Sequence, residues 1–260
     1  MTTTTIASTV DPTGTVPIRP QRFSTLLGVE VRKQVDTRSG RALLGVTVGA
    51  VVALLVWKLL HTSEIPPSFV NYTQSTRATI TTLLPVVGLL AMTSEWTQRT
   101  ALTTFTISPR RGRVIAAKFA AALLLAMVVM VVCMLLTAGA TALGGRIEPG
   151  GMGFDHLAEQ LWSTTIATVC QVVMGAAFGA LIPITAVALG VFFLAPTVWA
   201  VLGPAVLQDQ ARWLDVFEAY SRIASSEPGR HLPQTLTAIA AWVVVPLVVG
   251  VHRSLRREVK

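Results

Sequence analysis

Residues 95–118 read EWTQRTALTTFTISPRRGRVIAAK and form a polar, basic stretch between two apolar runs. Loops rich in Lys and Arg stay on the cytoplasmic side of a membrane. The stretch therefore predicts a cytoplasmic loop, provided that the runs on either side of it cross a bilayer. Its single acid is Glu95, and its bases are Arg99, Arg110, Arg111, Arg113 and Lys118.

The composition of the whole chain supports that condition. Of its 260 residues 52% are hydrophobic and only 13% are charged, whereas soluble domains carry about 25% charged residues. The net charge of +8 raises the question of nucleic acid. However, the basic residues flank apolar runs and form no continuous basic face with interleaved aromatics. We therefore expect a protein of the cell membrane with no nucleic-acid partner.

Six apolar runs approach the roughly 20 residues that a helix needs to cross a bilayer, which predicts an all-α, multi-pass membrane protein. The second run is short and Thr-rich, and Pro85 and Gly88 interrupt it, so its Thr face should be covered by protein or line a water-filled path. Residues 61–76 are expected to be a loop, and the glycine-rich residues 144–153 a turn. The six spans are expected at about 42–60, 77–94, 119–140, 161–181, 184–203 and 235–251.

The segments outside the spans differ in character. Residues 1–19 are rich in Thr and predict a disordered cytoplasmic tail, which leaves residues 20–260 as one transmembrane domain. Residues 20–35 place apolar side chains at helical spacing with Glu30 and most other charges off that stripe, which indicates an amphipathic helix in the membrane interface. Residues 207–224 repeat apolar side chains at helical spacing and predict a helix on, or dipping into, the outer leaflet.

Charge gives an independent test of this topology. Residues 1–41, 95–118 and 252–260 together hold 15 of the 21 Lys and Arg residues and 5 of the 13 acids. The remaining segments hold 6 bases and 8 acids, so the two sides carry +10 and −2. Six spans produce this separation, which five or seven would break, and it predicts that both termini are cytoplasmic.

Motifs for catalysis are missing from the sequence. It has no H-E-x-x-H, no G-x-S-x-G with a partner His, no metal-ligand spacing and no Walker-type phosphate loop. Cys133 and Cys170 both fall in apolar runs and are expected to be small buried residues. We therefore expect no catalytic residue, no metal site and no cofactor bound by this chain. If ATP drives its action, another chain must supply the nucleotide site.

Polar side chains inside the spans are few. Gln171 is the most polar of them, and an interhelical hydrogen bond and a contact with a transported molecule are both open for it. Two glycine pairs, Gly45 with Gly49 and Gly175 with Gly179, have the spacing that lets helices pack closely. Charged residues are nearly absent from the expected spans, which argues against an ion-coupled carrier.

The spacing of Glu95, Thr100, Pro109-Arg110-Arg111 and Lys118 resembles the loop between the second and third spans of the ABC type-2 export permeases. In that family the loop forms a coupling helix that sits in a cleft of a separate ATPase subunit. The resemblance implies that these residues contact the ATPase: Glu95, Trp96, Gln98, Arg99, Thr100, Thr103, Phe105, Pro109, Arg110, Arg111 and Lys118.

The same resemblance implies a complex of two permease chains, expected to be identical, with two ATPase subunits that hold ATP and Mg²⁺. The substrate path is expected to include Thr79, Thr82, Pro85, Gln171 and Thr197. The alternative from a different class is a membrane scaffold or membrane enzyme that transports nothing and has no ATPase partner.

Overall fold

The computed structural model of the chain describes residues 22–97, 111–147, 153–223, 229 and 231–256. The α-helices in these ranges are α1 (Phe23–Asp36), α2 (Arg38–Leu60), α3 (Phe69–Thr97), α5 (Arg111–Ile147), α6 (Leu157–Leu181), α7 (Thr185–Leu207), α8 (Val216–Ile223), α9 (Leu232–Ile239) and α10 (Val245–Arg256). A 3₁₀ helix (Gln208–Trp213) follows α7, and a π-helical turn (Ala240–Val244) joins α9 to α10. No strand occurs in the described ranges.

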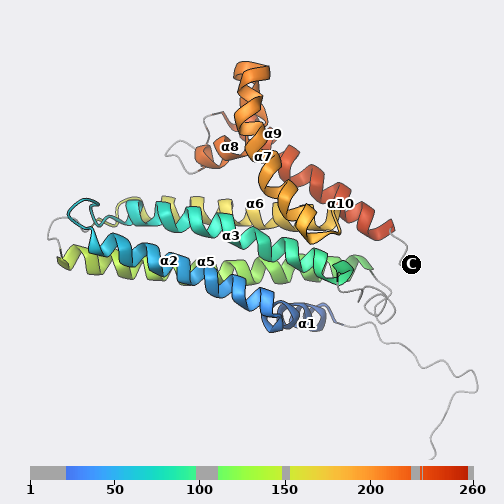
Figure 1. The fold of residues 1–260 in the computed structure, drawn as a ribbon, viewed down its shortest axis with the longest axis horizontal. Coiled ribbons are helices and arrows are strands. Elements are labelled where there is room, and N and C mark those ends of the chain that lie inside the picture. The colour runs from blue at the N-terminus through green and yellow to red at the C-terminus, as the bar shows by residue number, and fades with distance from the viewer. Residues whose placement is uncertain (1–21, 98–110, 148–152, 224–228, 230, 257–260) are drawn as a thin grey trace, which may run out of the picture.

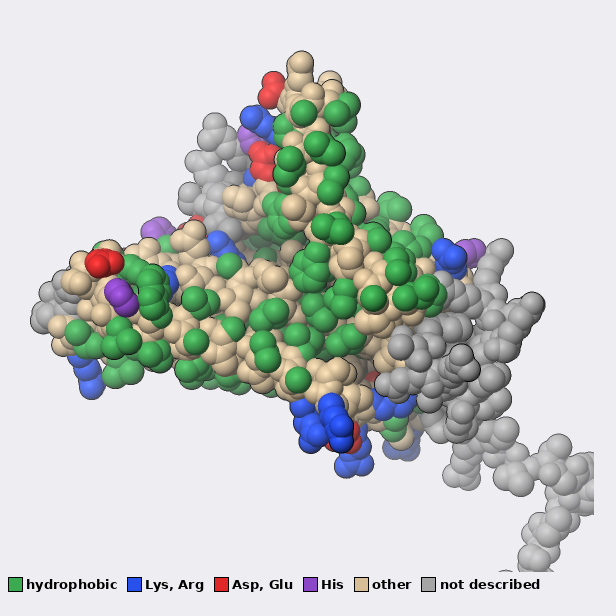
Figure 2. Space-filling view, viewed as in Figure 1, with side chains coloured by type: hydrophobic (Ala, Val, Ile, Leu, Met, Phe, Trp, Pro, Cys, Tyr) green, Lys and Arg blue, Asp and Glu red, His purple; other side chains and the backbone are tan. Residues whose placement is uncertain are grey.

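Six of these helical segments are long and apolar enough to cross a membrane, which indicates a multi-pass membrane protein and confirms the expected number of spans. Apolar side chains are exposed along their surfaces (Figure 2), as lipid-facing helices require. The six segments are Arg38–Leu60, Phe69–Ser94, Gly112–Ile147, Leu157–Leu181, Thr185–Trp213 and Leu232–Leu255.

The helices form two groups (Figure 1). Helices α2, α3, α5 and α6 run side by side, whereas α7 and the α9–α10 segment leave this layer steeply. Helix α1 packs against the beginning of α5, and Leu255 at the end of α10 lies beside Gly112. We call this the α1 end of the bundle. The opposite end holds the connection from α2 to α3.

Helix α3 begins at Phe69, two turns before the expected second span, so the expectation of a loop through Thr76 was wrong. The Ser68 hydroxyl accepts the backbone N–H of Asn71 at 3.3 Å and caps the helix. Thr76 then bonds to Thr137 of α5 through their hydroxyl groups at 2.8 Å, with both side chains buried. A Thr-rich segment can remain helical within the bundle because its hydroxyls have partners there.

Helix α5 is longer than expected at both ends. It begins at Arg111, inside the stretch expected to be a loop, and ends at Ile147, inside the expected glycine-rich turn. Gly144 is helical, and a Cβ there would lie 2.5 Å from Pro67 and 3.2 Å from the hydroxyl of Tyr72. The glycine is therefore needed for close packing between α5 and the α2–α3 connection, not for a bend.

A seam of close backbone contact joins α3 to α6. A Cβ on Gly175 would overlap the carbonyl oxygen of Pro85, and one on Gly179 would lie 2.6 Å from that of Leu89. The Gly175/Gly179 pair therefore packs as its spacing predicted. By contrast, no atom comes within 4 Å of where a Cβ would stand on Gly45 or Gly49.

The segment after α7 folds in two pieces where one helix over 207–224 was expected. The 3₁₀ helix ends before Leu214, and Asp215 then caps α8 by accepting the N–H groups of Phe217 and Glu218 at 2.9 and 3.0 Å. The last spanning segment contains a π-helical turn just before Pro246. Because proline lacks an N–H, a wider turn accommodates it with little loss of hydrogen bonding.

Candidate functional site

A cavity of about 230 Å³ lies where α7 diverges from α3 and α6. Helix α8 closes one of its sides. Four separate helices thus contribute to one space inside a membrane protein, which is a common setting for a small-molecule site. Its lining residues are Thr81, Thr82, Gln171, Met174, Phe192, Phe193, Pro196, Thr197, Val216 and Phe217.

Three threonine hydroxyls on the cavity wall already donate to the backbone of their own helix. Thr81 donates to the Arg77 carbonyl at 2.7 Å, Thr82 to Ala78 at 2.8 Å, and Thr197 to Phe193 at 2.7 Å. A hydroxyl has one hydrogen and two lone pairs. These side chains therefore present acceptors, not donors, to a molecule in the cavity.

Gln171 supplies the polar group at the middle of α6. Its Oε1 atom is buried and accepts no hydrogen bond from any residue in the described ranges. A buried acceptor without a partner costs about 1–3 kcal/mol relative to a satisfied one. A hydroxyl, amine or amide donor on a bound molecule would remove that cost.

The rest of the wall is apolar and includes three phenylalanines. Phe192 is 4% exposed and packs edge-on against Phe178 of α6, with ring centroids 6.0 Å apart, and against Phe193 at 4.9 Å. Phe217 projects from α8. Because no lining residue is ionisable, the wall cannot neutralise a full charge. The cavity suits a small apolar or aromatic molecule that carries hydrogen-bond donors.

Two tryptophans hold the segment that brings α8 to the cavity. Trp242 donates from Nε1 to the Leu214 carbonyl at 2.6 Å, and Trp199 donates to the Ala211 carbonyl at 3.3 Å. Tyr220 of α8 is half-buried, and its hydroxyl oxygen is buried without a partner among the described residues. Burial raises the pKa of that hydroxyl, with a smaller contribution from Cys170 of α6.

The structure gathers three of the five residues expected on the substrate path. Thr82, Gln171 and Thr197 line this one cavity although they come from three helices. Thr79 does not line it and donates to the Ser75 carbonyl at 2.9 Å, while Pro85 lies in the glycine seam. Sequence reasoning missed the aromatic wall: the spacing over residues 207–224 placed Phe217 on an apolar stripe but did not indicate what it faces.

Most of the residues expected to contact an ATPase lie outside the described residues: Gln98, Arg99, Thr100, Thr103, Phe105, Pro109 and Arg110. Glu95 and Trp96 belong to the last turn of α3, and Arg111 begins α5. Only Lys118 has a described side chain, and it occupies an internal position.

Lys118 forms a buried ion pair with Glu30 of α1. Its Nζ lies 2.7 Å from Glu30 Oε2, and the two side chains are 5% and 7% exposed. Lys33 Nζ contacts the other carboxylate oxygen at 3.0 Å. Glu30 was expected off the buried face of its helix, and that expectation was wrong. The signal was present, because Glu30 lies one helical turn from Leu26 and Leu27.

Arg77 is a half-buried charged residue whose position within a span was not expected from the sequence. Because α3 begins at Phe69, Arg77 lies two turns inside a spanning helix instead of at its start. Its guanidinium donates to the Ser163 hydroxyl of α6 at 3.4 Å. A charged side chain within a span is costly and usually faces other helices, and Arg77 contacts α6 in this way.

Comparison with known proteins does not assign the chain to a family. No protein-family model matches the chain, and no curated protein matches it in sequence. Among the described residues, no group of three or more His, Cys, Asp and Glu side chains could hold a metal ion.

Proposed function

We propose that this chain is the membrane subunit of an ATP-driven exporter in the cell membrane and receives its energy from a separate ATPase through residues 95–118. The observation that supports this most is the buried pair between Glu30 and Lys118. It ties α1 to the first turns of α5, which make up the last part of that segment. Breaking a buried pair costs about 3–5 kcal/mol, so α1 and α5 should move as one unit.

In the proposed complex, two permease chains bind two ATPase subunits, which hold ATP and Mg²⁺. Both termini and residues 95–118 face the cytoplasm, where basic segments are retained. Movement of the ATPase would displace residues 98–110 and, with them, the ends of α3 and α5. Helix α6 would follow α3 because of the glycine seam, and the cavity beside α7 would change shape.

The cavity belongs, in this proposal, to the path of the exported molecule. Its acceptor-lined, aromatic wall favours a neutral or weakly basic apolar compound with hydrogen-bond donors. Thr82, Gln171 and Thr197 would contact that compound. The small volume means that a larger substrate would occupy the cavity only in part.

The proposal is tested by purifying the tagged chain from its native membranes and identifying what accompanies it. We expect an ATPase with a Walker A motif and ATP hydrolysis by the complex. Replacing Gln98, Arg99 and Thr100 together by Ala should remove the ATPase or its activity. The matched control is Arg38→Ala with Arg41→Ala, two exposed positions at the same end of the bundle. A chain that purifies without an ATPase favours the scaffold or enzyme alternative instead.

The cavity is tested in the same complex by measuring the stimulation of ATP hydrolysis with a panel of apolar amides and weakly basic aromatic amines, which are neutral at pH 7. Gln171→Leu should abolish the stimulation and raise stability by about 1 kcal/mol, because it removes an unpaired buried acceptor. Thr165→Val on the same helix is the control, since Thr165 does not line the cavity. Normal stimulation in Gln171→Leu would exclude this cavity from the path.

A further inference from the structure

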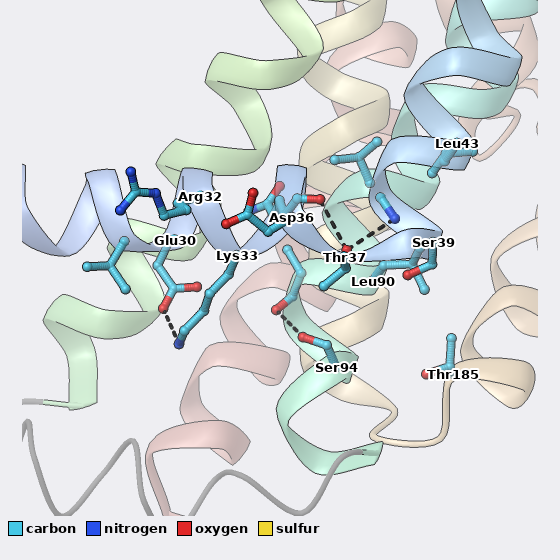
Figure 3. A pocket seen from close by; sticks show the side chains of 15 residues that line it. Glu30, Arg32, Lys33, Asp36, Thr37, Ser39, Leu43, Leu90, Ser94 and Thr185 are labelled. Carbon is cyan, nitrogen blue, oxygen red and sulfur yellow. Dashed lines mark hydrogen bonds and ion pairs between the residues drawn. The ribbon is translucent and has the colours of Figure 1, made fainter.

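A second, larger cavity lies at the α1 end of the bundle, away from the cavity beside α8. Its volume is about 650 Å³, within the range of small-molecule sites. Helix α1 forms one wall, and α2, α3 and the start of α7 form the others (Figure 3). The lining residues are Val29, Glu30, Arg32, Lys33, Gln34, Asp36, Thr37, Ser39, Gly40, Leu43, Val87, Leu90, Ala91, Ser94 and Thr185.

The walls of this cavity differ in polarity along its depth. The α1 wall carries two bases and two acids, whereas Leu43, Val87 and Leu90 line it within the spanning helices. A helix rises 1.5 Å per residue, so Leu43 lies only about 8 Å from the start of α2. The boundary between polar and apolar lining therefore falls at one edge of the membrane-spanning region, where lipid headgroups lie.

The charges on the polar wall balance. Glu30 is already occupied by Lys33 and Lys118. The exposed side chains of Arg32 and Asp36, in contrast, have no ion-pair or hydrogen-bond partner anywhere in the described ranges. They stand four residues apart on α1, which places their Cβ atoms about 5–6 Å from each other. The exposed part of the polar wall, which we call the rim, thus presents one cation (Arg32) and one anion (Asp36) on the same face of α1.

We propose that this cavity binds one zwitterionic glycerophospholipid with an ethanolamine headgroup, drawn from the leaflet at the α1 end. The Arg32 guanidinium would donate two hydrogen bonds to the phosphate, and the ammonium would donate to the Asp36 carboxylate. A two-carbon bridge separates phosphate from ammonium in this headgroup, matching the neighbouring positions of the two side chains. The acyl chains would lie along Leu43, Val87 and Leu90.

The headgroup chemistry separates ethanolamine from choline and glycerol headgroups. A choline headgroup has no N–H to donate to Asp36, and a glycerol headgroup has no cation to pair with it. Gln34 also lines the cavity, and both polar atoms of its amide are buried without a partner among the described residues. Rotation of that side chain would supply a further donor and acceptor to a polar headgroup.

The test uses the full chain in nanodiscs of dioleoyl phosphatidylcholine that contain equal small fractions of the phosphatidylethanolamine and phosphatidylglycerol forms. After transfer to mild detergent, native mass spectrometry counts the lipids retained on each chain. We expect one phosphatidylethanolamine per chain, retained about tenfold over either other lipid, as loss of one charge-assisted hydrogen bond implies. Equal retention of the three lipids would overturn the proposal.

Variants separate the site from general binding to the bilayer. Arg32→Ala should reduce retention about tenfold, and Asp36→Asn should remove the preference for ethanolamine over choline. Arg41→Ala is the control, since Arg41 is equally basic and exposed but does not line the cavity. An ethanolamine preference that survives Asp36→Asn would contradict the assignment.

A bulky side chain that occupies the apolar part of the cavity gives a second test, which does not depend on charge. Leu90→Trp should displace the lipid, whereas Leu83→Trp, on α3 but outside the cavity, should not. Removing residues 2–19 tests the chain's own tail as the occupant. If lipid is retained only after that deletion, the tail fills the cavity and the proposal fails.

Discussion

Helices α3 and α6 meet in two contrasting ways along their length. On one face their backbones touch through Gly88, Gly175 and Gly179, with carbonyl oxygens of the opposite helix 2.6–2.7 Å from where two of the missing Cβ atoms would stand. On another face, the same two helices and α7 enclose a cavity. One pair of helices thus carries both a closed seam and an open site.

Side-chain size accounts for the difference. Where glycine occurs on a facing turn, the backbones approach until they are in contact, so packing holds α3 and α6 together. Beside the cavity the wall residues carry side chains, and α7 packs on α6 through an apolar cluster that includes Phe192 and Phe178. We infer that α3 and α6 form the fixed part of the site and α7 the part that can move.

The largest effect is expected at the aromatic contact that holds α7. Phe192→Ala should lower the free energy of unfolding by about 3–5 kcal/mol, because Phe192 is buried and its loss would enlarge an existing cavity. Chemical unfolding in detergent micelles, followed by tryptophan fluorescence, measures the change.

Phe193→Ala is the matched control, since Phe193 lines the same cavity but is 39% exposed. Its loss should cost about 1 kcal/mol. If both substitutions cost the same, Phe192 is not the anchor, and the contrast between a fixed seam and a movable α7 loses its basis.

The next largest effect is expected from replacing glycine by alanine, once in the α3–α6 seam and once on α7. Gly175→Ala should destabilise the protein by about 2 kcal/mol, because the new methyl group would overlap the Pro85 carbonyl and force the backbones apart. Gly190→Ala on α7 should instead stabilise it by about 0.5–1 kcal/mol, because nothing lies within 4 Å and alanine is the better helix former.

The same unfolding measurement compares the two glycine variants. Effects of opposite sign would support a closed seam and an open α7. A stabilising effect of Gly175→Ala would mean that the seam is looser than its geometry indicates.

The number of spans followed from the sequence, whereas several of their boundaries did not. Long apolar runs predicted all six spanning helices. The extensions of α3 to Phe69 and of α5 to Ile147 could not be read from apolar content, because the added turns are polar or glycine-rich. They are helical because tertiary partners, such as Thr137 for Thr76, satisfy their polar groups.

The site was predicted in part. Thr82, Gln171 and Thr197 were recognised as polar residues in apolar spans, and such residues are confined to protein-lined positions. Nothing in local sequence indicates that Phe192 and Phe217 face them, since that depends on how steeply α7 crosses α6. For Glu30, the spacing from Leu26 and Leu27 indicated an inward position, but its partner Lys118, 88 residues away, could not be read from local sequence.

The smallest effect is expected at Tyr220, where α8 fills the opening between α6 and α7. Burial raises the pKa of its hydroxyl above the ordinary value of about 10. In the unfolded chain the hydroxyl ionises near pH 10, while in the folded chain it stays protonated. Stability should therefore fall above about pH 10, by up to about 1.4 kcal/mol per pH unit, and be unaffected by this group at lower pH.

Tyr220→Phe removes this dependence and should also raise stability by about 1 kcal/mol near neutral pH, because the buried hydroxyl lacks a partner. Unfolding free energies of both proteins at pH 8, 9, 10 and 11 give the comparison, in which all other titrating groups cancel. Parallel curves would show that Tyr220 reaches solvent and that α8 is not packed against α6, leaving the cavity open on that side.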